Sequence, residues 1–342
     1  MSGRQVRRLA IVAAIAVALA APFVLPTYLV TLLSLVFIAA LLASSVDLLA
    51  GQGGLVSIGH AGIAASAAYA IAYGTTESVG PLAQLGLALV VTLAVSAVYA
   101  LTTMRTRGIV FLMITLALGI VVYGLALKLT TITGGQNGLT GIDRPELLAS
   151  STAFYLLTVV TFVLAVGFRA VVARSPFGLV LRGTRESESR MSSLGYSVSR
   201  AKFLAVMLSG LLAGSAGVLI VWQAEFISPN VASFSRSAMA VVMVILGGTG
   251  TLLGPLIGAG VVVGTEHWLS SYVERWPTLL GLVFIAVVLF APGGVVGAVT
   301  RWRYGDVRAR QDAEPGTRAT TPSLLEEQAV VGEADGRPSE PQ

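Results

Sequence analysis

Long apolar runs dominate the pattern of hydrophobic and polar positions along the chain. From about residue 9 to residue 299 these runs are roughly twenty residues long, which is what a helix needs to cross a hydrocarbon core of about 30 Å. Runs such as Leu9 to Leu25 are apolar on every side, whereas the strand of a membrane barrel would alternate polar and apolar residues. The pattern therefore predicts an all-α polytopic membrane protein.

The successive runs define the predicted membrane spans. The region 237–271 must begin and end on the same side of the membrane, and two short helices broken between Gly247 and Pro255 achieve this as a full crossing pair or as a re-entrant hairpin. We therefore expect about ten transmembrane helices, about eight of them complete crossings. The complete crossings are predicted at residues 9–25, 28–50, 55–73, 79–101, 108–129, 152–172, 203–223 and 277–299.

Composition and charge support this assignment and add an orientation. The chain is 55% hydrophobic and 11% charged, with a mean hydropathy of +0.83, which excludes an ordinary soluble globule. Its formal charge of +5 lies mostly in arginine clusters near residues 4–8, 105–107, 169–200 and 301–310. Because positive loops stay on the cytoplasmic side, both termini and the long loop 174–202 are expected to be cytoplasmic. The charge indicates a membrane orientation and no nucleic-acid partner.

The two ends of the chain carry separate expectations. A basic start followed by an apolar stretch and Ala18-Leu19-Ala20 is also typical of a cleaved secretory signal, although the apolar run continues through Leu25. Residues 1–300 are predicted to form the transmembrane domain. Residues 301–342 are polar and almost free of aromatic residues, so they cannot bury enough apolar area to offset the entropy of ordering and are predicted to form a disordered cytoplasmic tail.

Two glycine-rich elements interrupt the apolar pattern, at residues 50–62 and 246–255. Irregular backbone survives at membrane depth only where it is buried in protein or lines a wet cavity, which favours a translocation pathway. The alternative is that these glycines only let helices pack closely, and that His60 is a hydrogen-bonded structural residue. The candidate pathway residues are Gly53, Gly54, Ser57, His60, Gly247, Gly248 and Gly250.

Two loops are candidates for contact with other proteins. The outer segment 131–142 is rich in glycine and asparagine, and it is expected to form either a shaped docking loop or a plain connector; its candidate residues are Gly134, Gly135, Asn137 and Gly138. The inner loop 174–202 is polar and charged, with Pro176 able to open a helix and Leu194-Gly195 able to end one. A short amphipathic helix is predicted there, with a solvated loop as the alternative.

Five motifs occur in an order that resembles a known family. Residues 53–61 read GGLVSIGHA, similar to the GYGGLLSLGHA pattern of bacterial branched-chain amino acid ABC transporter permeases, and residues 133–142 read TGGQNGLTGI, similar to the TGGxNGLxGI of the LivM type of subunit. SPFG at 175–178, FISP at 226–229 and LGGTGTLLGP at 246–255 also match. The resemblance covers about residues 45 to 297 and is carried by the motifs together rather than by any one of them.

The resemblance implies a type II importer-like permease in the bacterial inner membrane. The implied partners are a second, LivH-like permease subunit, two cytoplasmic ATP-binding subunits, an extracytoplasmic solute-binding protein and membrane lipid. The inner loop would be the coupling helix that sits in a groove of the ATPase, and the solutes would be leucine, isoleucine and valine, or else urea, short amides or other amino acids. The coupling residues carried over are Phe177, Gly178, Arg182, Arg185, Glu186, Leu194 and Gly195.

The residues themselves give no sign of an enzyme. A phosphate-binding loop places a lysine directly after a glycine, but the chain's lysines, Lys128 and Lys202, follow Leu127 and Ala201, so a partner chain is expected to use the ATP. The sequence holds no cysteine, no HExxH motif and two histidines, so no catalytic residue, metal or cofactor is expected in this chain. An ion-coupled carrier or a passive channel is the alternative from another class, although neither needs a cytoplasmic docking loop.

Overall fold

The computed structural model describes residues 3–269 and the single positions 278, 281, 282, 285, 294, 295 and 297. Backbone contacts divide the chain into Met1–Val299 and Thr300–Gln342, and all the described residues belong to the first part. The predicted tail at 301–342 lies outside the described residues. The predicted span at 277–299 is described at too few positions to be tested.

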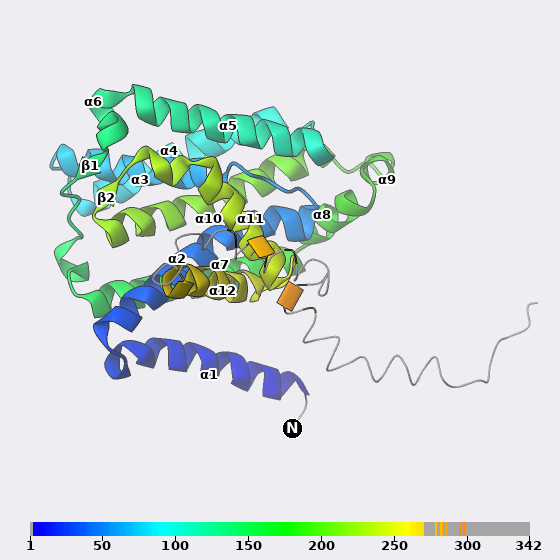
Figure 1. The fold of residues 1–342 in the computed structure, drawn as a ribbon. Helices are drawn as coiled ribbons and strands as arrows, with labels where there is room; N and C mark the ends of the chain where they lie inside the picture. The colour runs from blue at the N-terminus through cyan, green and yellow to red at the C-terminus, as the bar shows by residue number, and fades with distance from the viewer. Residues whose placement is uncertain are drawn as a thin grey trace, which may run out of the picture. The chain divides into compact units, whose positions relative to one another are not determined.

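The described residues are almost entirely helical, as the apolar runs predict (Figure 1). A π-helical turn, Leu48–Gly53, continues α2 without a break, and three short 3-10 turns lie at Gly135–Asn137, Glu146–Leu148 and Pro229–Ala232. The strands β1 (Leu139–Thr140) and β2 (Phe226–Ile227) form an antiparallel pair. The helices are α1 Gly3–Val24, α2 Thr27–Asp47, α3 His60–Thr76, α4 Pro81–Thr103, α5 Gly108–Lys128, α6 Thr130–Thr133, α7 Ser151–Arg174, α8 Pro176–Glu186, α9 Glu188–Ser193, α10 Val198–Ala224, α11 Phe234–Gly247 and α12 Gly254–Leu269.

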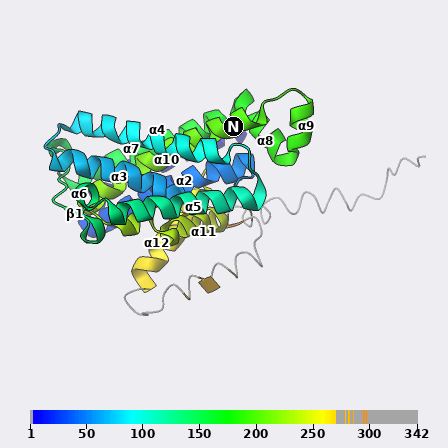
Figure 2. The same ribbon diagram turned by 90° about the horizontal axis from the view of Figure 1, so that it is seen from above.

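Small residues on α10 set the packing of the central helices. A β-carbon added to Gly217 would lie 1.9 Å from the carbonyl oxygen of Ala64, and one added to Gly210 would lie 1.9 Å from the hydroxyl of Ser96. These contacts bring α10 into backbone range of α3 and close to α4, an arrangement that small residues permit in membrane helix bundles. Figure 2 shows α2, α3, α4 and α10 running side by side.

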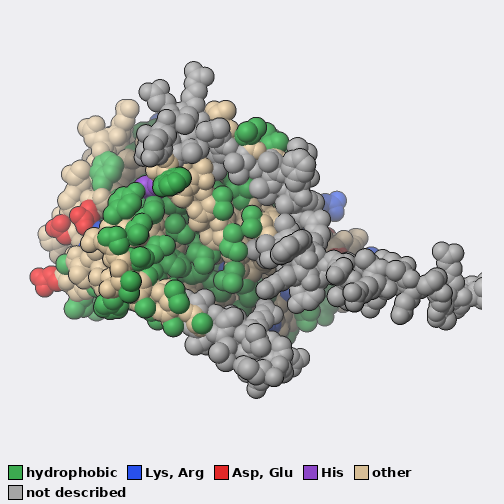
Figure 3. Space-filling view, turned by 60° about the horizontal axis from the view of Figure 1, so that its bottom comes forward, with side chains coloured by type: hydrophobic (Ala, Val, Ile, Leu, Met, Phe, Trp, Pro, Cys, Tyr) green, Lys and Arg blue, Asp and Glu red, His purple; other side chains and the backbone are tan. Residues whose placement is uncertain are grey.

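Within the described residues, five helical segments are long and apolar enough to cross a membrane: Thr27–Gly53, Pro81–Thr103, Gly108–Lys128, Ser151–Arg174 and Val198–Ala224. Large apolar side chains on α4, α5 and α7 are exposed, among them Leu82, Ile109 and Leu164. Figure 3 shows hydrophobic side chains gathered on another face of the molecule. Exposed apolar surface of this extent is not tolerated in water. The chain is therefore an all-α, multi-pass membrane protein.

Some helix boundaries differ from the predicted spans. The third span was expected from residue 55, but α3 begins at His60 because Gly54, with a φ of +66°, ends the π turn in a left-handed conformation. The two short helices expected at 237–271 are present as α11 and α12, of 14 and 16 residues. At 1.5 Å per residue these helices are about 21 and 24 Å long, shorter than a hydrocarbon core of about 30 Å. The count of ten crossings therefore stays a prediction.

The two ends of the bundle have different structures. At one end, β1 and β2 join the connection after α5 to the connection after α10, with Leu139 opposite Ile227. At the other end, α8 and α9 form a helical pair that leaves the bundle, as Figure 1 shows. Lys202 on α10 holds this pair by donating hydrogen bonds to Glu188 Oε1 (2.5 Å) and to the carbonyl oxygen of Thr106 (2.7 Å).

Candidate functional site

A buried ion pair between α2 and α7 forms the centre of the candidate site. Arg169 Nη2 donates to Asp47 Oδ2, and Arg169 Nη1 lies 3.4 Å from the hydroxyl of Ser44. The side chain of Asp47 is fully buried and that of Arg169 is 4% exposed. Because a lone charge is very costly in such an environment, each of these groups needs the other.

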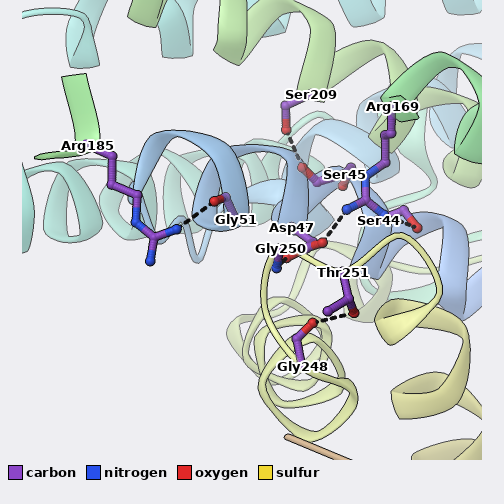
Figure 4. A network of polar contacts seen from close by, with 10 residues as sticks. All are labelled: Ser44, Ser45, Asp47, Gly51, Arg169, Arg185, Ser209, Gly248, Gly250 and Thr251. Atoms are coloured by element: carbon purple, nitrogen blue, oxygen red, sulfur yellow. Dashed lines mark hydrogen bonds and ion pairs between the residues drawn. The ribbon is translucent and has the colours of Figure 1, made fainter. Parts of the chain in front are cut away.

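Asp47 also binds the second glycine-rich element. Its Oδ1 accepts a hydrogen bond of 2.7 Å from the backbone nitrogen of Gly250, in the loop between α11 and α12. The backbones touch here, since a β-carbon added to Gly51 would lie 2.5 Å from Gly250 Cα. The loop is held from within by Thr251, whose hydroxyl donates to the carbonyl oxygen of Gly248 (2.8 Å). The two glycine-rich elements, about 200 residues apart, therefore meet at one place, as Figure 4 shows.

Two arginines of α8 complete the site from the side of the inner loop. Arg185 Nη1 donates to the carbonyl oxygen of Gly51 (2.8 Å), and Arg182 Nη1 donates to Gln52 Oε1 (2.9 Å) and to the carbonyl oxygen of Ala173 (2.7 Å). The last carbonyls of a helix lack partners within the helix and carry its partial negative charge, so cations are favoured there. We call the set Asp47, Gly51, Arg169, Arg185 and Gly250 the inner junction (Figure 4).

A second polar cluster surrounds His60 at the start of α3. Ser209 on α10 donates its hydroxyl to the carbonyl oxygen of Ser45 (2.6 Å), so His60 Nε2, 2.5 Å from that hydroxyl, must be the donor in their contact. The other ring nitrogen, Nδ1, lies 2.9 Å from the hydroxyl of Ser57. In the described part of the chain no group of three or more His, Cys, Asp or Glu side chains is placed to share a metal ion.

The structure places the predicted pathway residues in different surroundings. Gly248 and Gly250 lie in the loop that meets the inner junction, and Gly54 lies against Arg185, whose Cγ would be 2.7 Å from an added β-carbon. Gly247 instead packs α11 against α12, with an added β-carbon 1.8 Å from the carbonyl oxygen of Gly254. Gly53 is buried without such a backbone contact. Pathway lining by these glycines, and by Ser57 and His60, stays a prediction.

The inner loop forms helices as expected, but its side chains point differently. Two helices, α8 and α9, replace the one that was predicted, and Gly195 follows them with a φ of +85°. Phe177, expected to be the anchor for a partner, packs against the protein's own core, and Gly178 is buried against α7. Arg182 donates to the side-chain oxygen of Gln52 in the π turn and to the carbonyl oxygen of Ala173 at the end of α7. Arg185 is exposed, and its guanidinium donates to the carbonyl oxygen of Gly51 in the π turn.

The residues of α8 and α9 that do face outward are a different set. Leu179 is 61% exposed, Leu194 is 66% exposed and Tyr196 is 50% exposed. Glu186 is also exposed. Of the predicted coupling residues, Arg185, Glu186, Leu194 and Gly195 are therefore exposed, as contact with a partner requires.

The predicted outer residues lie together at the other end of the bundle. Asn137 is exposed in a 3-10 turn, between Gly135 and Gly138. A β-carbon added to Gly138 would lie 2.1 Å from the carbonyl oxygen of Ile227, so this glycine allows the turn to approach β2. Gly134 ends α6 in a left-handed conformation with a φ of +70°. The segment is thus held at this end of the bundle, attached to the connection after α10.

Sequence reasoning missed the ion pair at the centre of the site. Asp47 was not among the candidate residues, and Arg169 was counted only as a member of the arginine cluster at 169–200. The available signal was the rarity of charges within apolar spans, which makes a buried acid and a buried base natural partners. Gly51 was not singled out from the glycines around it, because only its contact with Gly250 distinguishes it.

Comparison with known proteins finds relatives of this chain among transport permeases. Residues 28–292 match the family described as branched-chain amino acid transport system / permease component. The LivM permease proteins of the high-affinity branched-chain amino acid transport systems of Salmonella typhimurium and Escherichia coli are 27% and 28% identical, over 85% of this chain and 75% of each relative. The LsrC permease protein of an autoinducer 2 import system, from Klebsiella pneumoniae, is 28% identical over 46% of this chain and 47% of its own length.

No solved structure matches the chain significantly. The family match nevertheless spans most of the chain and includes both glycine-rich elements and the inner loop. The chain belongs to the family of permease components of branched-chain amino acid transport systems.

Proposed function

We propose that the chain is one of two membrane-spanning subunits of an ATP-driven importer in the bacterial inner membrane. Membership of the family and the likeness to LivM permease proteins support this role. LivH permease proteins also match this chain over nearly half its length, which supports pairing with a similar but distinct subunit. ATP hydrolysis is assigned to cytoplasmic partner subunits, and delivery of the solute to an extracytoplasmic binding protein.

The observation that carries the proposal is the outward face of α8 and α9. This pair is the charged, amphipathic element at one end of a bundle that is otherwise apolar, yet it exposes Leu179, Leu194 and Tyr196. Apolar side chains on an element outside the membrane are favourable only where a partner covers them. An ATPase subunit that docks on this face would be displaced when the solute pathway changes state, and would drive that change in return.

The docking role is tested by one substitution and its matched control. Leu179→Asp places a charge at the centre of the proposed contact, so the ATPase subunits should no longer copurify and uptake into proteoliposomes should fall by at least about tenfold. Leu147→Asp makes the same change at a residue that is 89% exposed near the other end of the bundle, and ATPase copurification should be retained. Retained copurification and uptake in Leu179→Asp would overturn the docking role.

The proposed sidedness is tested by labelling. The sequence contains no cysteine, so a single introduced cysteine gives an unambiguous signal. Asn137→Cys should react with a membrane-impermeant maleimide in intact cells, because it is exposed at the end proposed to face outward. Ser192→Cys, exposed on α9, should react only after the cells are opened. Labelling of Ser192→Cys in intact cells would contradict the proposed cytoplasmic position of α8, α9 and both termini.

Leucine, isoleucine and valine are the proposed solutes. The two relatives with the widest coverage belong to systems named for branched-chain amino acids, whereas the autoinducer 2 permease matches over less than half of this chain. Uptake of labelled leucine by the reconstituted importer should be competed by isoleucine and valine. Competition by urea, short amides or polar amino acids instead would show that another solute class is carried.

The buried ion pair supports a second candidate function, an ion-coupled carrier, since such carriers use ionisable groups within the membrane. Against this, both carboxylate oxygens of Asp47 are engaged, one by Arg169 and one by Gly250, and the side chain is fully buried. Uptake by the permease pair without ATPase subunits, driven by an imposed ion gradient, would favour the carrier. Uptake that requires ATP and survives a protonophore would favour the importer.

A further inference from the structure

We propose that the inner junction is the element through which α8 moves both glycine-rich segments, with Arg185 as the positioning residue that links α8 to them. This inference rests on the proposed function, because it assumes that an ATPase displaces α8. It adds what family membership does not state, namely which contacts inside this chain carry that displacement.

The first step is that the π turn is held at one end by a contact that cannot easily open. Asp47 immediately precedes the turn, and it is buried against Arg169 of α7. Separating two buried partners leaves an uncompensated charge in each, which is far more costly than breaking an exposed contact. Asp47 therefore provides a fixed point about which the remainder of the turn can move.

The second step is that the other end of the turn is held by a contact that can open. Arg185 is an exposed residue of α8, and its guanidinium reaches the carbonyl oxygen of Gly51. Water can replace Gly51 as the partner of the exposed guanidinium, so this link costs less to open than the fully buried ion pair. The turn itself is π-helical, a geometry that is rare and often found at functional sites. Gly53 and Gly54 add no side chains that would lock it.

The third step is that Gly51 cannot move without moving the loop between α11 and α12. The backbones of Gly51 and Gly250 are in direct contact, since a β-carbon added to Gly51 would lie 2.5 Å from Gly250 Cα. Displacement of Gly51 toward the loop would therefore push Gly250, while displacement away would leave a gap that packed interiors avoid. One movement of α8 is thus passed to both glycine-rich segments.

Spin-label distances in the complete importer test this directly. In nanodiscs that hold both permease subunits, the ATPase subunits and the loaded binding protein, labels at Ser192, on α9 directly after α8, and at Leu101 report the movement of α8. Labels at Leu253 and Leu101 report the loop. All three positions are exposed. Trapping the ATPase with ATP and vanadate should shift both distances in the otherwise unchanged protein.

In Arg185→Gln the distance that reports α8 should still shift on trapping, but the distance that reports the loop should not. Uptake should fall by at least about tenfold, while ATP hydrolysis should change by less than about twofold. Arg185→Lys keeps a donor that can reach Gly51 and should restore part of the loop shift. The control Arg107→Gln removes an exposed arginine from the turn between α4 and α5 and should behave as the unchanged protein.

A full loop shift in Arg185→Gln would overturn the inference, as would loss of the α8 shift, which would mean that Arg185 acts on the ATPase itself. Should Arg185→Gln fail to assemble, Arg185→Lys decides. A loop shift that is reduced together with uptake supports the link, whereas a full loop shift with reduced uptake, or loss of the loop shift with normal uptake, overturns it. Absence of any shift in the unchanged protein, with the ATPase bound, would instead count against the proposed function.

Discussion

The two ends of the bundle each contain an arginine that joins distant segments, but in different environments. At the inner junction, Arg169 and Asp47 are 4% and 0% exposed. At the end that carries β1 and β2, Arg144 lies 3.2 Å from Glu225, and their side chains are 13% and 54% exposed. The first pair cannot exchange a partner for water, whereas the acidic partner of the second can.

The outer arginine depends on its other contacts. Arg144 Nε donates to the carbonyl oxygen of Trp222 (2.5 Å), its Nη2 donates to that of Gln223 (3.2 Å), and its guanidinium lies 4.4 Å from the ring centroid of Phe154. Arg144 thus caps the end of α10 and lies over an aromatic ring, whatever Glu225 does. The two ion pairs therefore have different structural roles. The pair of Asp47 and Arg169 balances buried charge, whereas the pair of Arg144 and Glu225 accompanies a helix cap that does not depend on it.

The largest effect is expected from breaking the inner pair. Asp47→Ala leaves Arg169 buried without its partner, so the protein should lose about 3–5 kcal/mol of stability. The double variant Asp47→Asn with Arg169→Gln removes both charges and keeps an acceptor for Gly250, so it should recover most of the loss. Thermal unfolding in detergent, followed by size-exclusion fluorescence, measures both. Equal loss in the single and double variants would contradict the charge-balance role.

The next largest effect is expected from removing the outer arginine. Arg144→Ala should cost about 1.5–3 kcal/mol, because two carbonyl groups at the end of α10 lose a charged donor. Arg144→Lys should recover only part, since one ammonium group cannot reproduce two fixed directions of donation. The same unfolding assay applies. A loss as large as that of Asp47→Ala would remove the distinction between the two ends.

Backbone contact at the inner junction should give an effect of similar or smaller size. Gly51→Ala forces Gly250 away, since the new β-carbon would lie 2.5 Å from its Cα, and should cost about 1–3 kcal/mol. Gly86→Ala is the matched control, because it adds the same methyl group to α4 where nothing lies within 4 Å. The control should be neutral or slightly stabilising, as alanine favours a helix. Equal stability of the two variants would contradict the close contact.

The smallest effect is expected at the acidic partner of the outer pair. Glu225→Gln removes a charge that is about half exposed, and it should change stability by less than about 1 kcal/mol. The small difference should shrink further at high salt, because ions screen exposed pairs. Unfolding measured at low and high salt tests this. A loss above that of Arg144→Ala would show that the ion pair, rather than the helix cap, holds this end.

Prediction from the sequence succeeded where the physical cause is local. The apolar runs gave the long helices, Pro176 marked the start of α8, and the glycines after Gly247 marked the break between α11 and α12. Prediction was less successful where a contact joins segments that are far apart in the sequence. The contacts of Arg182 and Arg185 with the π turn were not predicted, because helical periodicity shows which residues are polar, but not that Gln52 and Gly51 lie within their reach.

The sequence by itself determined that this chain is helical, enters a membrane repeatedly and belongs to a family of transport permeases, because burial of apolar side chains in lipid depends on each run separately. Only the tertiary structure decided that Asp47 pairs with Arg169, 122 positions away, and that Gly51 touches Gly250. The free energy of such contacts depends on the distance between segments and on the exclusion of water from between them. Neither quantity exists until the helices have packed.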